Sequence, residues 1–377
     1  MISTAELLLK EFLERDINFF AGVPDSLLKS FSIELDAHST HLEHIIAPNE
    51  GAAVALAAGH YLSSSSAAVV YLQNSGLGNT LNPLISLCDS QVYSIPLILL
   101  IGWRGEPGVE DEPQHLKQGE LTLPLLDLLG IPSFILNRTE QKYGSVVDKA
   151  VEYTKLRQSP VAIVVQSGVL QTQKKLKQDR KFGLTREKAI ELIIGSSVKG
   201  DFFVSTTGMI SRELFEIRSA QGEGIGREFL MVGSMGYASS ITLALALRHP
   251  DKRFICLDGD GSLLMHQGTM ALIGQSNACN LIHIVLNNGA HDSVGGQKTC
   301  ALEIDLCQIA KGFGYEQVFR VNSSIDLGSL LQEVDRGMTG STFIEIRVDC
   351  GSRSDLGRPS MTPIENRDVF MNHLLRD

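Results

Sequence analysis

The segment that decides the fold is RFICLDGDGSLLMHQGTMALIGQSNACNLIHIVLNNGAH, residues 253–291. An apolar run ends at Leu257 and is followed by a glycine-rich turn that contains Asp260. A helical stretch and a second apolar run, NLIHIVL, then lead to Asn287 and Asn288. Strand, turn, helix and strand in this order form a βαβ unit with parallel strands. The segment therefore predicts a doubly wound α/β domain with polar residues at the carboxyl ends of its strands.

The same segment contains a candidate metal site. If the two strands are neighbours, Asp260 and Asn288 reach the same edge of the sheet, where Ser262 can cap the following helix. A carboxylate, an amide oxygen and the main-chain carbonyl of Ala290 leave coordination positions open, which suits magnesium that also binds a diphosphate. Taken alone, GDG and NNG are ordinary turn signals. Their order along a βαβ unit favours the metal site over a pair of plain turns.

Apolar runs alternate with helical segments on both sides of this unit, as in other βαβ arrays. Between the two halves, the segment QTQKKLKQDRKFG (171–183) is highly charged and has hardly any apolar residue, so it is typical of a linker. We predict two tandem doubly wound, mainly parallel α/β domains, at 1–170 and 185–377, joined by a charged linker at 171–184. The strand candidates are 17–22, 41–48, 67–76, 96–103 and 160–168 in the first half, and 201–208, 228–236, 253–262, 280–289 and 342–349 in the second.

Composition narrows the choice of partner. The formal net charge of -10 disfavours binding to nucleic acid or to an anionic membrane, whereas a small anionic substrate can still bind a local basic pocket. The N-terminal segment is an amphipathic helix with charges throughout, and no apolar stretch approaches the ~20 residues of a membrane span, so we expect a cytoplasmic protein. The six cysteines lie far apart, without a CxxC pair, and are interpreted as buried thiols in a reducing compartment.

The segment 253–291 resembles the cofactor motif of thiamine-diphosphate-dependent decarboxylases, in which GDG is followed some thirty residues later by NN. The resemblance extends over nearly the whole chain, with no central domain between the halves. It implies a pyrimidine-binding domain followed by a diphosphate-binding domain, with thiamine diphosphate and Mg²⁺ as cofactors. It assigns the metal to Asp260, Asn288 and Ala290, and the diphosphate to the same turn, including Gly261 and Ser262. The matching stretches include AGVPDSLLKSF (21–31), PNEGAAVALAAGHY (48–61), YLQNSGLGNTLNPLISL (71–87), NNGAHDSVGGQ (287–297) and RSDLGRPSMTPIENRDVFM (353–371).

The resemblance also assigns the pyrimidine end of the cofactor. Glu50 matches the carboxylate that activates the aminopyrimidine of the cofactor. The activated aminopyrimidine then removes the proton from the thiazolium carbon. Gly233 would offer its carbonyl to the pyrimidine amino group, and Met235 would hold the cofactor in its bent form. On their own, Glu50 would be a glutamate at a helix start and Met235 a core residue. The metal motif in the second half favours the cofactor roles.

Several residues are candidates for substrate binding and proton transfer. Asp25 matches an active-site aspartate of related decarboxylases, although its position after Pro24 also suits a turn or a helix cap. Where larger relatives carry a histidine pair, this chain has Gln73, Asn74 and Ser75. We therefore expect a different proton relay, and Asn74 and Ser75 are themselves candidates for substrate binding. The remaining candidates are His115 and His291 for proton transfer and substrate binding, and Arg104, with Lys298 and Arg353 behind it, for a distal anion.

The small members of the family that act on phosphonopyruvate are the best match, which implies non-oxidative decarboxylation to phosphonoacetaldehyde and carbon dioxide, in phosphonate biosynthesis. A sulfopyruvate decarboxylase and a carboligase stay open as alternatives. A non-catalytic thiamine-diphosphate-binding protein is the alternative from another class, and Glu50 speaks against it because a pure binder needs no activating carboxylate. The resemblance further implies a homo-oligomer with its active sites between subunits.

Overall fold

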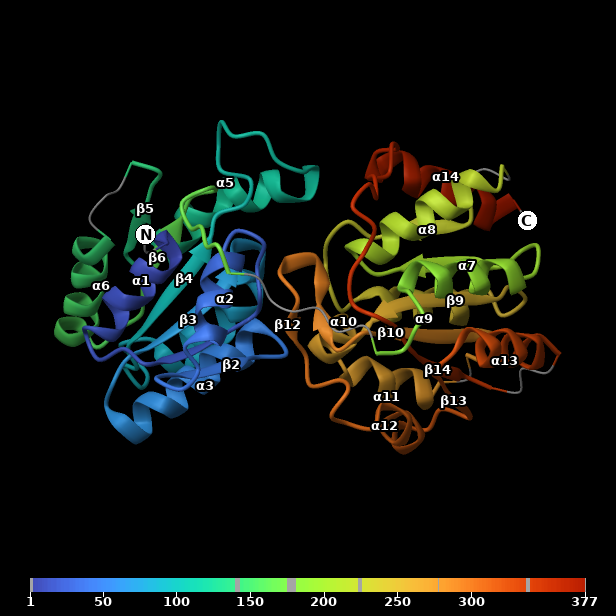
Figure 1. Cartoon of the computed structure of the whole chain (residues 1–377), viewed down its shortest axis with the longest axis horizontal. Coiled ribbons are helices and arrows are strands. Elements are labelled where there is room, and N and C mark those ends of the chain that lie inside the picture. The colour runs from blue at the N-terminus through green and yellow to red at the C-terminus, as the bar shows by residue number, and fades with distance from the viewer. Residues whose placement is uncertain are drawn as a thin grey trace. The chain divides into compact units, whose positions relative to one another are not determined.

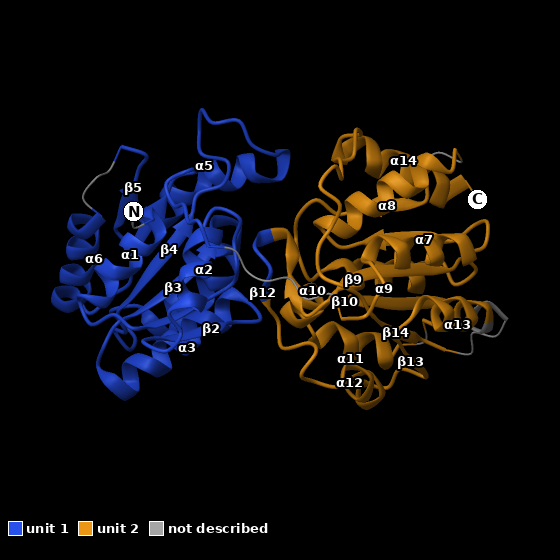
Figure 2. Cartoon of the chain, viewed as in Figure 1, with its two compact units in different colours: residues 1–177, 294–297 blue, residues 178–293, 298–377 orange. Residues whose placement is uncertain are grey.

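The computed structural model describes residues 3–139, 143–174, 181–222, 226–276, 278–336 and 340–376. The chain divides into two compact units, one of residues 1–177 and 294–297, the other of residues 178–293 and 298–377 (Figure 2). The charged linker predicted at 171–184 falls partly on residues 175–180, which lie outside the described residues. None of the described helices is long and apolar enough to cross a membrane.

The first unit is a six-stranded sheet in the order β2-β1-β3-β4-β6-β5, with every pairing parallel (Figure 1). Its strands are β1 (Phe19–Gly22), β2 (Glu43–Ile46), β3 (Ala68–Gln73), β4 (Leu97–Gly102), β5 (Ser133–Leu136) and β6 (Val161–Val165). Its helices are α1 (Thr4–Leu13), α2 (Lys29–Ala37), α3 (Glu50–Ser64), η1 (Asn74–Gly76), α4 (Leu77–Pro83), η2 (Leu84–Cys88), α5 (Pro113–Leu128) and α6 (Tyr143–Arg157).

The second unit is also a six-stranded parallel sheet, in the order β13-β14-β10-β9-β7-β8. Its strands are β7 (Phe202–Ser205), β8 (Glu228–Leu230), β9 (Phe254–Gly259), β10 (Leu281–Asn287), β13 (Gln317–Val321) and β14 (Thr342–Arg347), and a separate short ladder pairs β11 (Ala290–His291) with β12 (Gln297–Lys298). Its helices are α7 (Arg186–Ser196), α8 (Met209–Ala220), α9 (Ala238–Arg248), α10 (Asp260–Met265), α11 (Gly268–Gly274), α12 (Leu306–Phe313), α13 (Ser324–Arg336) and α14 (Pro363–Arg376). The short helix η3 (Asp292–Val294) ends on the first residue of the segment 294–297, which belongs to the first unit.

Both sheets are buried on their two faces, which explains their nearly continuous apolar strands. In the first unit, α1, α2 and α6 pack on one face and α3, α4 and α5 on the other. In the second unit, α7, α8 and α13 cover one face and α9, α11, α12 and α14 the opposite one. Side-chain caps begin several of these helices, since Ser3, Asn49, Thr185 and Asp305 each accept a hydrogen bond from a backbone N–H of the first turn.

The prediction of two doubly wound parallel α/β units is confirmed, with a strand at each of the ten predicted segments. The edge strands β5 and β13 escaped prediction because their side chains are mostly half-buried or exposed and lack a long apolar run. Ser262 was wrongly predicted as a helix cap, because α10 already begins at Asp260 after Gly259. The cysteines were also not all buried as expected, since Cys279 and Cys300 are exposed.

Candidate active site

Four candidate residues share one edge of the first sheet. Asp25 follows β1, Glu50 follows β2, Asn74 follows β3 and Arg104 lies just after β4. These strands are parallel neighbours in the order β2-β1-β3-β4. All four residues therefore lie at the carboxyl ends of adjacent strands, the edge at which open α/β sheets bind their ligands.

Glu50 occupies a tight polar cradle at the start of α3. The helix is capped by Asn49, whose side chain accepts the Ala52 N–H at 2.9 Å. Glu50 is buried, and the Asn79 amide donates to its Oε2 at 2.7 Å. A Cβ at Gly76 would lie 2.3 Å from Glu50 Oε1, so only glycine leaves room for the carboxylate there. Burial raises the pKa of Glu50, with the Asn79 hydrogen bond opposing, which suits a carboxyl group that shares a proton with a ligand.

Asp25 forms a local turn and keeps one oxygen without a partner. Its Oδ2 accepts the N–H groups of Leu27 and Leu28 at 3.1 and 3.2 Å, as in an Asx turn. Its Oδ1 is buried and has no hydrogen-bond partner among the described residues. Burial raises its pKa to about 6, against the turn hydrogen bonds and the attraction of Arg104. The turn is thus present, and a carboxyl group that can exchange its proton near neutral pH is present as well.

The raised pKa of Asp25 predicts a pH-dependent gain in stability for Asp25→Asn. The folded carboxyl has a pKa of about 6 against a reference of 3.8, so the folded state binds the proton more tightly than the unfolded chain. Its favourable contribution is present below the reference value and is lost as the pH rises through the folded value. Relative to wild type, we expect the variant to gain up to about 3 kcal/mol between pH 4 and pH 8. Urea unfolding across this range measures the gain in the free energy of unfolding. A difference between variant and wild type that does not change with pH would contradict the raised pKa of Asp25.

Arg104 is held by a network that sequence analysis did not identify. Its Nε donates to Asp111 Oδ2 at 2.8 Å, its Nη2 contacts the other Asp111 oxygen, and its Nη1 donates to Ser26 Oγ at 2.8 Å. Asn74 fixes the backbone of Arg104, donating to its carbonyl at 2.7 Å and accepting its N–H at 3.1 Å. The Asn74 amide also donates to Thr122 Oγ1 at 2.9 Å. These bonds favour a role for Asn74 in orienting Arg104 over direct contact with a substrate.

Two other candidates of the first unit lie close to this network. The Ser75 hydroxyl accepts a hydrogen bond from Gln73 Nε2 at 2.6 Å. His115 lies in the first turn of α5, and its Nδ1 is buried without a partner among the described residues. Burial and then the charge of Arg104 lower the pKa of His115, while Asp111 opposes them. The ring is therefore predominantly neutral at pH 7 and can accept or relay a proton.

The second unit brings Asp260 and the Asn288 loop together. β9 and β10 are parallel neighbours with Gly259 opposite Leu286, so the predicted adjacency of the two strands is confirmed. Asp260 is 2 % exposed, and its carboxylate accepts the Thr299 hydroxyl and the backbone N–H of Asn288. Burial raises its pKa to about 7. A buried carboxylate of this kind fits a site for a positive ion.

The Asn288 loop offers oxygen atoms and is firmly held. Asn288 Oδ1 accepts the Ala290 N–H at 3.0 Å, and its Nδ2 donates to Asp292 Oδ2 at 2.7 Å. The Thr299 N–H donates to the Gly289 carbonyl at 2.9 Å and so ties the loop to the partner of Asp260. A carboxylate, an amide oxygen and a carbonyl are the ligand types that Mg²⁺ prefers. The residues present therefore fit the expected metal.

The glycine turn after β9 lies against His291, and the next residue, Ser262, connects it to other segments. A Cβ at Gly261 would lie 2.6 Å from the His291 Cε1, so the imidazole lies directly against this turn. Burial lowers the pKa of His291 to about 4, which keeps the ring neutral at pH 7. Ser262 Oγ bonds Thr206 Oγ1 at 2.8 Å and accepts the Gly236 N–H at 3.0 Å. Ser262 thereby links the segments that follow β7, β8 and β9.

The remaining candidates lie apart from these contacts or are already paired. Gly233 and Met235 are half-buried in the segment between β8 and α9, one to three residues before the Gly236–Ser262 contact. Lys298 is exposed in β12. Arg353 forms ion pairs with the carboxylates of Glu187, Glu216 and Asp355, so its charge is largely compensated within the protein.

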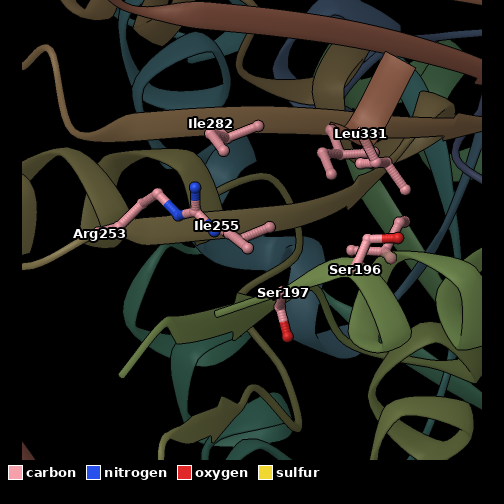
Figure 3. A pocket seen from close by; sticks show the side chains of 8 residues that line it. Ser196, Ser197, Arg253, Ile255, Ile282 and Leu331 are labelled. Carbon is pink, nitrogen blue, oxygen red and sulfur yellow. The ribbon is translucent and has the colours of Figure 1, made fainter. Parts of the chain in front are cut away.

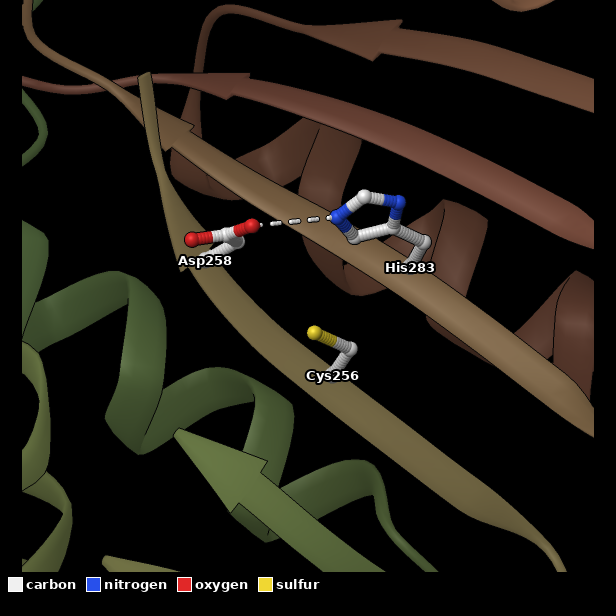
Figure 4. A group of neighbouring side chains, drawn as sticks. All are labelled: Cys256, Asp258 and His283. Carbon is white, nitrogen blue, oxygen red and sulfur yellow. Dashed lines mark hydrogen bonds and ion pairs between the residues drawn. The ribbon is translucent and has the colours of Figure 1, made fainter. Parts of the chain in front are cut away.

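Two further features of the second unit are not assigned to this site. Cys256, Asp258 and His283 form a fully buried group of metal-ligand type (Figure 4), in which His283 bonds the Tyr315 hydroxyl at 2.9 Å. Burial, and next the charge of Asp258, raise the pKa of Cys256 well above its usual value, so the thiol stays protonated and we interpret the group as part of the core. A small, mainly apolar pocket beside Arg253 and Ile282 lies toward the amino-terminal ends of β9 and β10 (Figure 3), remote from Asp260 along the strand.

Comparison with known proteins identifies the class to which this fold and these sites belong. The N-terminal TPP-binding domain of thiamine pyrophosphate enzymes matches residues 2–131. The C-terminal TPP-binding domain of the same enzymes matches residues 207–346. The first match contains Asp25, Glu50 and Arg104, and the second contains Asp260 and Asn288. Thiamine pyrophosphate, or thiamine diphosphate, is thus the cofactor of both matched domains.

Full-length relatives narrow the class further. A phosphonopyruvate decarboxylase of Streptomyces viridochromogenes is 34% identical over 92% of this chain and 88% of its own. A phosphonopyruvate decarboxylase of Streptomyces hygroscopicus is 32% identical over 97% of this chain and 92% of its own. A sulfopyruvate decarboxylase of Methanosarcina acetivorans is 30% identical over 99% of this chain and 98% of its own. The chain belongs to the thiamine-diphosphate-dependent decarboxylase family that includes these enzymes, and it is a carboxy-lyase.

Proposed function

We propose that this enzyme decarboxylates phosphonopyruvate to phosphonoacetaldehyde and carbon dioxide, in phosphonate biosynthesis. Two relatives that act on phosphonopyruvate, at 34% and 32% identity, support this substrate over sulfopyruvate, whose decarboxylase is 30% identical. The observation that carries the proposal is the polar edge of the first sheet, which combines the buried carboxyls of Glu50 and Asp25 with the guanidinium of Arg104. A small dianionic 2-oxo acid needs this combination of proton-transfer groups and a cation.

One group of residues would bind the diphosphate end of the cofactor with its metal ion, and another would bind the pyrimidine end. When bound, thiamine diphosphate supplies the electron sink for the loss of carbon dioxide. Asp260, Asn288 and the Ala290 carbonyl would hold Mg²⁺, and Gly261 and Ser262 would line the diphosphate. The Glu50 carboxyl would share a proton with the pyrimidine ring, and the Gly233 carbonyl and the Met235 side chain would hold the ring in place. We further propose a cytoplasmic homo-oligomer whose active sites lie between subunits.

The substrate would be bound mainly by residues of the first unit. Arg104 uses three of its five N–H donors on Asp111 and on Ser26 Oγ, so its remaining N–H groups and the Ser26 hydroxyl would provide donors for the phosphonate oxygens. Asp25, with a pKa raised to about 6, and His115, with a lowered pKa, are the candidates for delivering the proton that replaces the lost carboxylate. His291 and Ser75 remain candidates for additional contacts to the substrate.

Replacing Arg104 by alanine should weaken the use of phosphonopyruvate selectively. A charge-assisted contact contributes roughly 1.5–3 kcal/mol, so we expect kcat/KM to fall about 10- to 150-fold. Pyruvate lacks the distal anion, so its turnover should change little. Steady-state kinetics on both substrates measure this difference. Arg15→Ala is the matched control, because Arg15 is a partly buried arginine of the same unit that pairs with Glu11 and Asp148. Equal losses for both substrates would assign Arg104 a role in the fold or in cofactor binding.

Product analysis tests the type of reaction. The purified enzyme, loaded with thiamine diphosphate and Mg²⁺, is incubated with phosphonopyruvate; phosphorus and proton NMR follow the organic product, and carbon-13 NMR of labelled substrate follows the carbon dioxide. The proposal predicts phosphonoacetaldehyde and an equal amount of carbon dioxide. A condensed acid in place of the aldehyde would identify a carboligase, and an unchanged substrate would contradict phosphonopyruvate as the substrate.

A further inference from the structure

A chain of buried charged groups connects the start of α7 with the Asn288 loop. Arg186 Nε and Nη2 donate to the two carboxylate oxygens of Glu213 at 2.8 and 2.9 Å. Arg186 Nη1 donates to Asp292 Oδ2 at 3.0 Å. The side chains of Arg186, Glu213 and Asp292 are only 5%, 2% and 7% exposed. Removing these charges from water has a free-energy cost that a salt bridge recovers only with good geometry, so stability alone is a weak reason for this arrangement.

The chain ends on the side chain of Asn288. Asp292 Oδ2 accepts three hydrogen bonds, from Arg186 Nη1, from Asn288 Nδ2 at 2.7 Å and from the Gly351 N–H at 2.8 Å. An ionised carboxylate only accepts hydrogen bonds, so it must face the nitrogen of the Asn288 amide and not its oxygen. Asp292 therefore fixes which way this amide is turned.

The orientation of the amide determines what the loop can bind. With its nitrogen on Asp292, Asn288 directs Oδ1 to the Ala290 N–H, which lies within the same loop at 3.0 Å. A carbonyl-type oxygen has two lone pairs, so Oδ1 retains the capacity to bind a cation. The reverse orientation would present two N–H donors, which cannot bind a metal ion.

We propose that Asp292, held by the Arg186–Glu213 pair, is a positioning residue that presents the side-chain oxygen of Asn288 to the metal ion. The inference rests on the proposed function, in which Asn288 is a metal ligand. Partners of this kind, one contact beyond the ligand, typically change metal affinity about 10- to 100-fold when they are replaced. Asp292 itself need not contact the cofactor or the substrate.

Asp292→Asn tests the proposal through metal affinity. An amide at position 292 can pair with either orientation of Asn288 and so removes the discrimination while keeping the size of the side chain. With Mn²⁺ as the probe and thiamine diphosphate present, we expect an affinity about 10- to 100-fold weaker by electron paramagnetic resonance titration. Asp201→Asn is the matched control, because Asp201 is the buried partner of Arg253 in the same unit, at 2.6 and 2.8 Å. Its Mn²⁺ affinity should equal that of wild type.

A double-mutant cycle separates positioning from a general loss of structure. In the Asn288→Ala background, Asp292→Asn should cause no further loss of Mn²⁺ affinity, because there is no amide left to orient. An additional loss of the same size as in wild type would overturn the proposal. Glu213→Gln, which loosens Arg186 without touching the loop, provides a second variant if Asp292→Asn fails to fold, and we expect a smaller loss in the same direction. Unchanged affinity in that variant would then overturn the proposal.

The proposed function and this inference can fail separately. If Asp260→Ala binds Mn²⁺ as tightly as wild type, the metal site is elsewhere, and the metal assignment of the proposed function fails together with this inference. If wild type binds Mn²⁺ through Asp260 and Asp292→Asn binds it equally well, the proposed function stands and only the role of Asp292 is overturned.

Discussion

Replacing Glu50 by glutamine is expected to slow proton exchange at the thiazolium carbon of the bound cofactor by roughly 10²- to 10⁴-fold. Glutamine fits the space beside Gly76. Its carbonyl oxygen can still accept the hydrogen bond that Asn79 Nδ2 donates to Glu50 Oε2 at 2.7 Å in the wild-type protein. The fold and the binding of the cofactor should therefore survive. An amide cannot share a proton with the pyrimidine ring as a carboxyl group does, so activation of the cofactor should be lost. Hydrogen–deuterium exchange of the bound cofactor, followed by NMR, measures the rate.

A second buried glutamate of the same unit provides the control. Glu34 lies in α2, is 1 % exposed, and pairs with Lys174. Glu34→Gln should lower stability without changing the exchange rate, because Glu34 lies on the helix and away from the four strand-end residues. Wild-type exchange in Glu50→Gln would remove Glu50 from the mechanism.

Replacing Asp260 by alanine should abolish cofactor retention together with metal binding. The diphosphate is expected to bind through the cation, so loss of the carboxylate removes both. Truncating one partner of a buried charge contact typically costs roughly 2–5 kcal/mol, or about 30- to 5,000-fold in affinity. The apoprotein should stay folded, because burial already raises the pKa of this carboxyl to about 7 and its ionisation at pH 8 therefore opposes folding.

Calorimetric titration of the apoprotein with thiamine diphosphate, with and without Mg²⁺, measures this loss. The exposed Asp251 offers a control aspartate in the same unit, and Asp251→Ala should bind both ligands as wild type does. Full retention of the cofactor by Asp260→Ala in a chelating buffer would contradict the metal assignment.

The sequence predicted the fold well where the strands lie in the middle of a sheet. Central strands such as β4 and β10 are buried on both faces and therefore appear as continuous apolar runs. Two of the four edge strands, β2 and β8, were also predicted, whereas β5 and β13 are partly exposed, lack a long apolar run and were missed. A sheet edge is defined by what the strand pairs with, and that information is not local.

The sequence predicted the site only in part, because some of its residues lie in local motifs and others are brought in by the fold. Asp260, Asn288 and Glu50 lie in short recognisable motifs, whereas their partners come from distant positions. Thr299 reaches Asp260 from a segment that has no motif, and Arg186 reaches Asp292 from 106 residues away. Ser26 and Asp111 were near the predicted residues in sequence, but their contacts with Arg104 depend on how the segment after β4 folds back. Sequence motifs identify the residues expected to bind the metal and the cofactor. Only the folded structure shows which other residues position them.

The most direct test of the account is a parallel measurement of kcat/KM for phosphonopyruvate, sulfopyruvate and pyruvate with enzyme loaded with thiamine diphosphate and Mg²⁺. A coupled aldehyde assay follows all three substrates. We predict turnover that requires the cofactor, with the highest kcat/KM for phosphonopyruvate and the lowest for pyruvate, which lacks the distal anion that Arg104 would bind. A higher kcat/KM for sulfopyruvate, or decarboxylation without thiamine diphosphate, would contradict it.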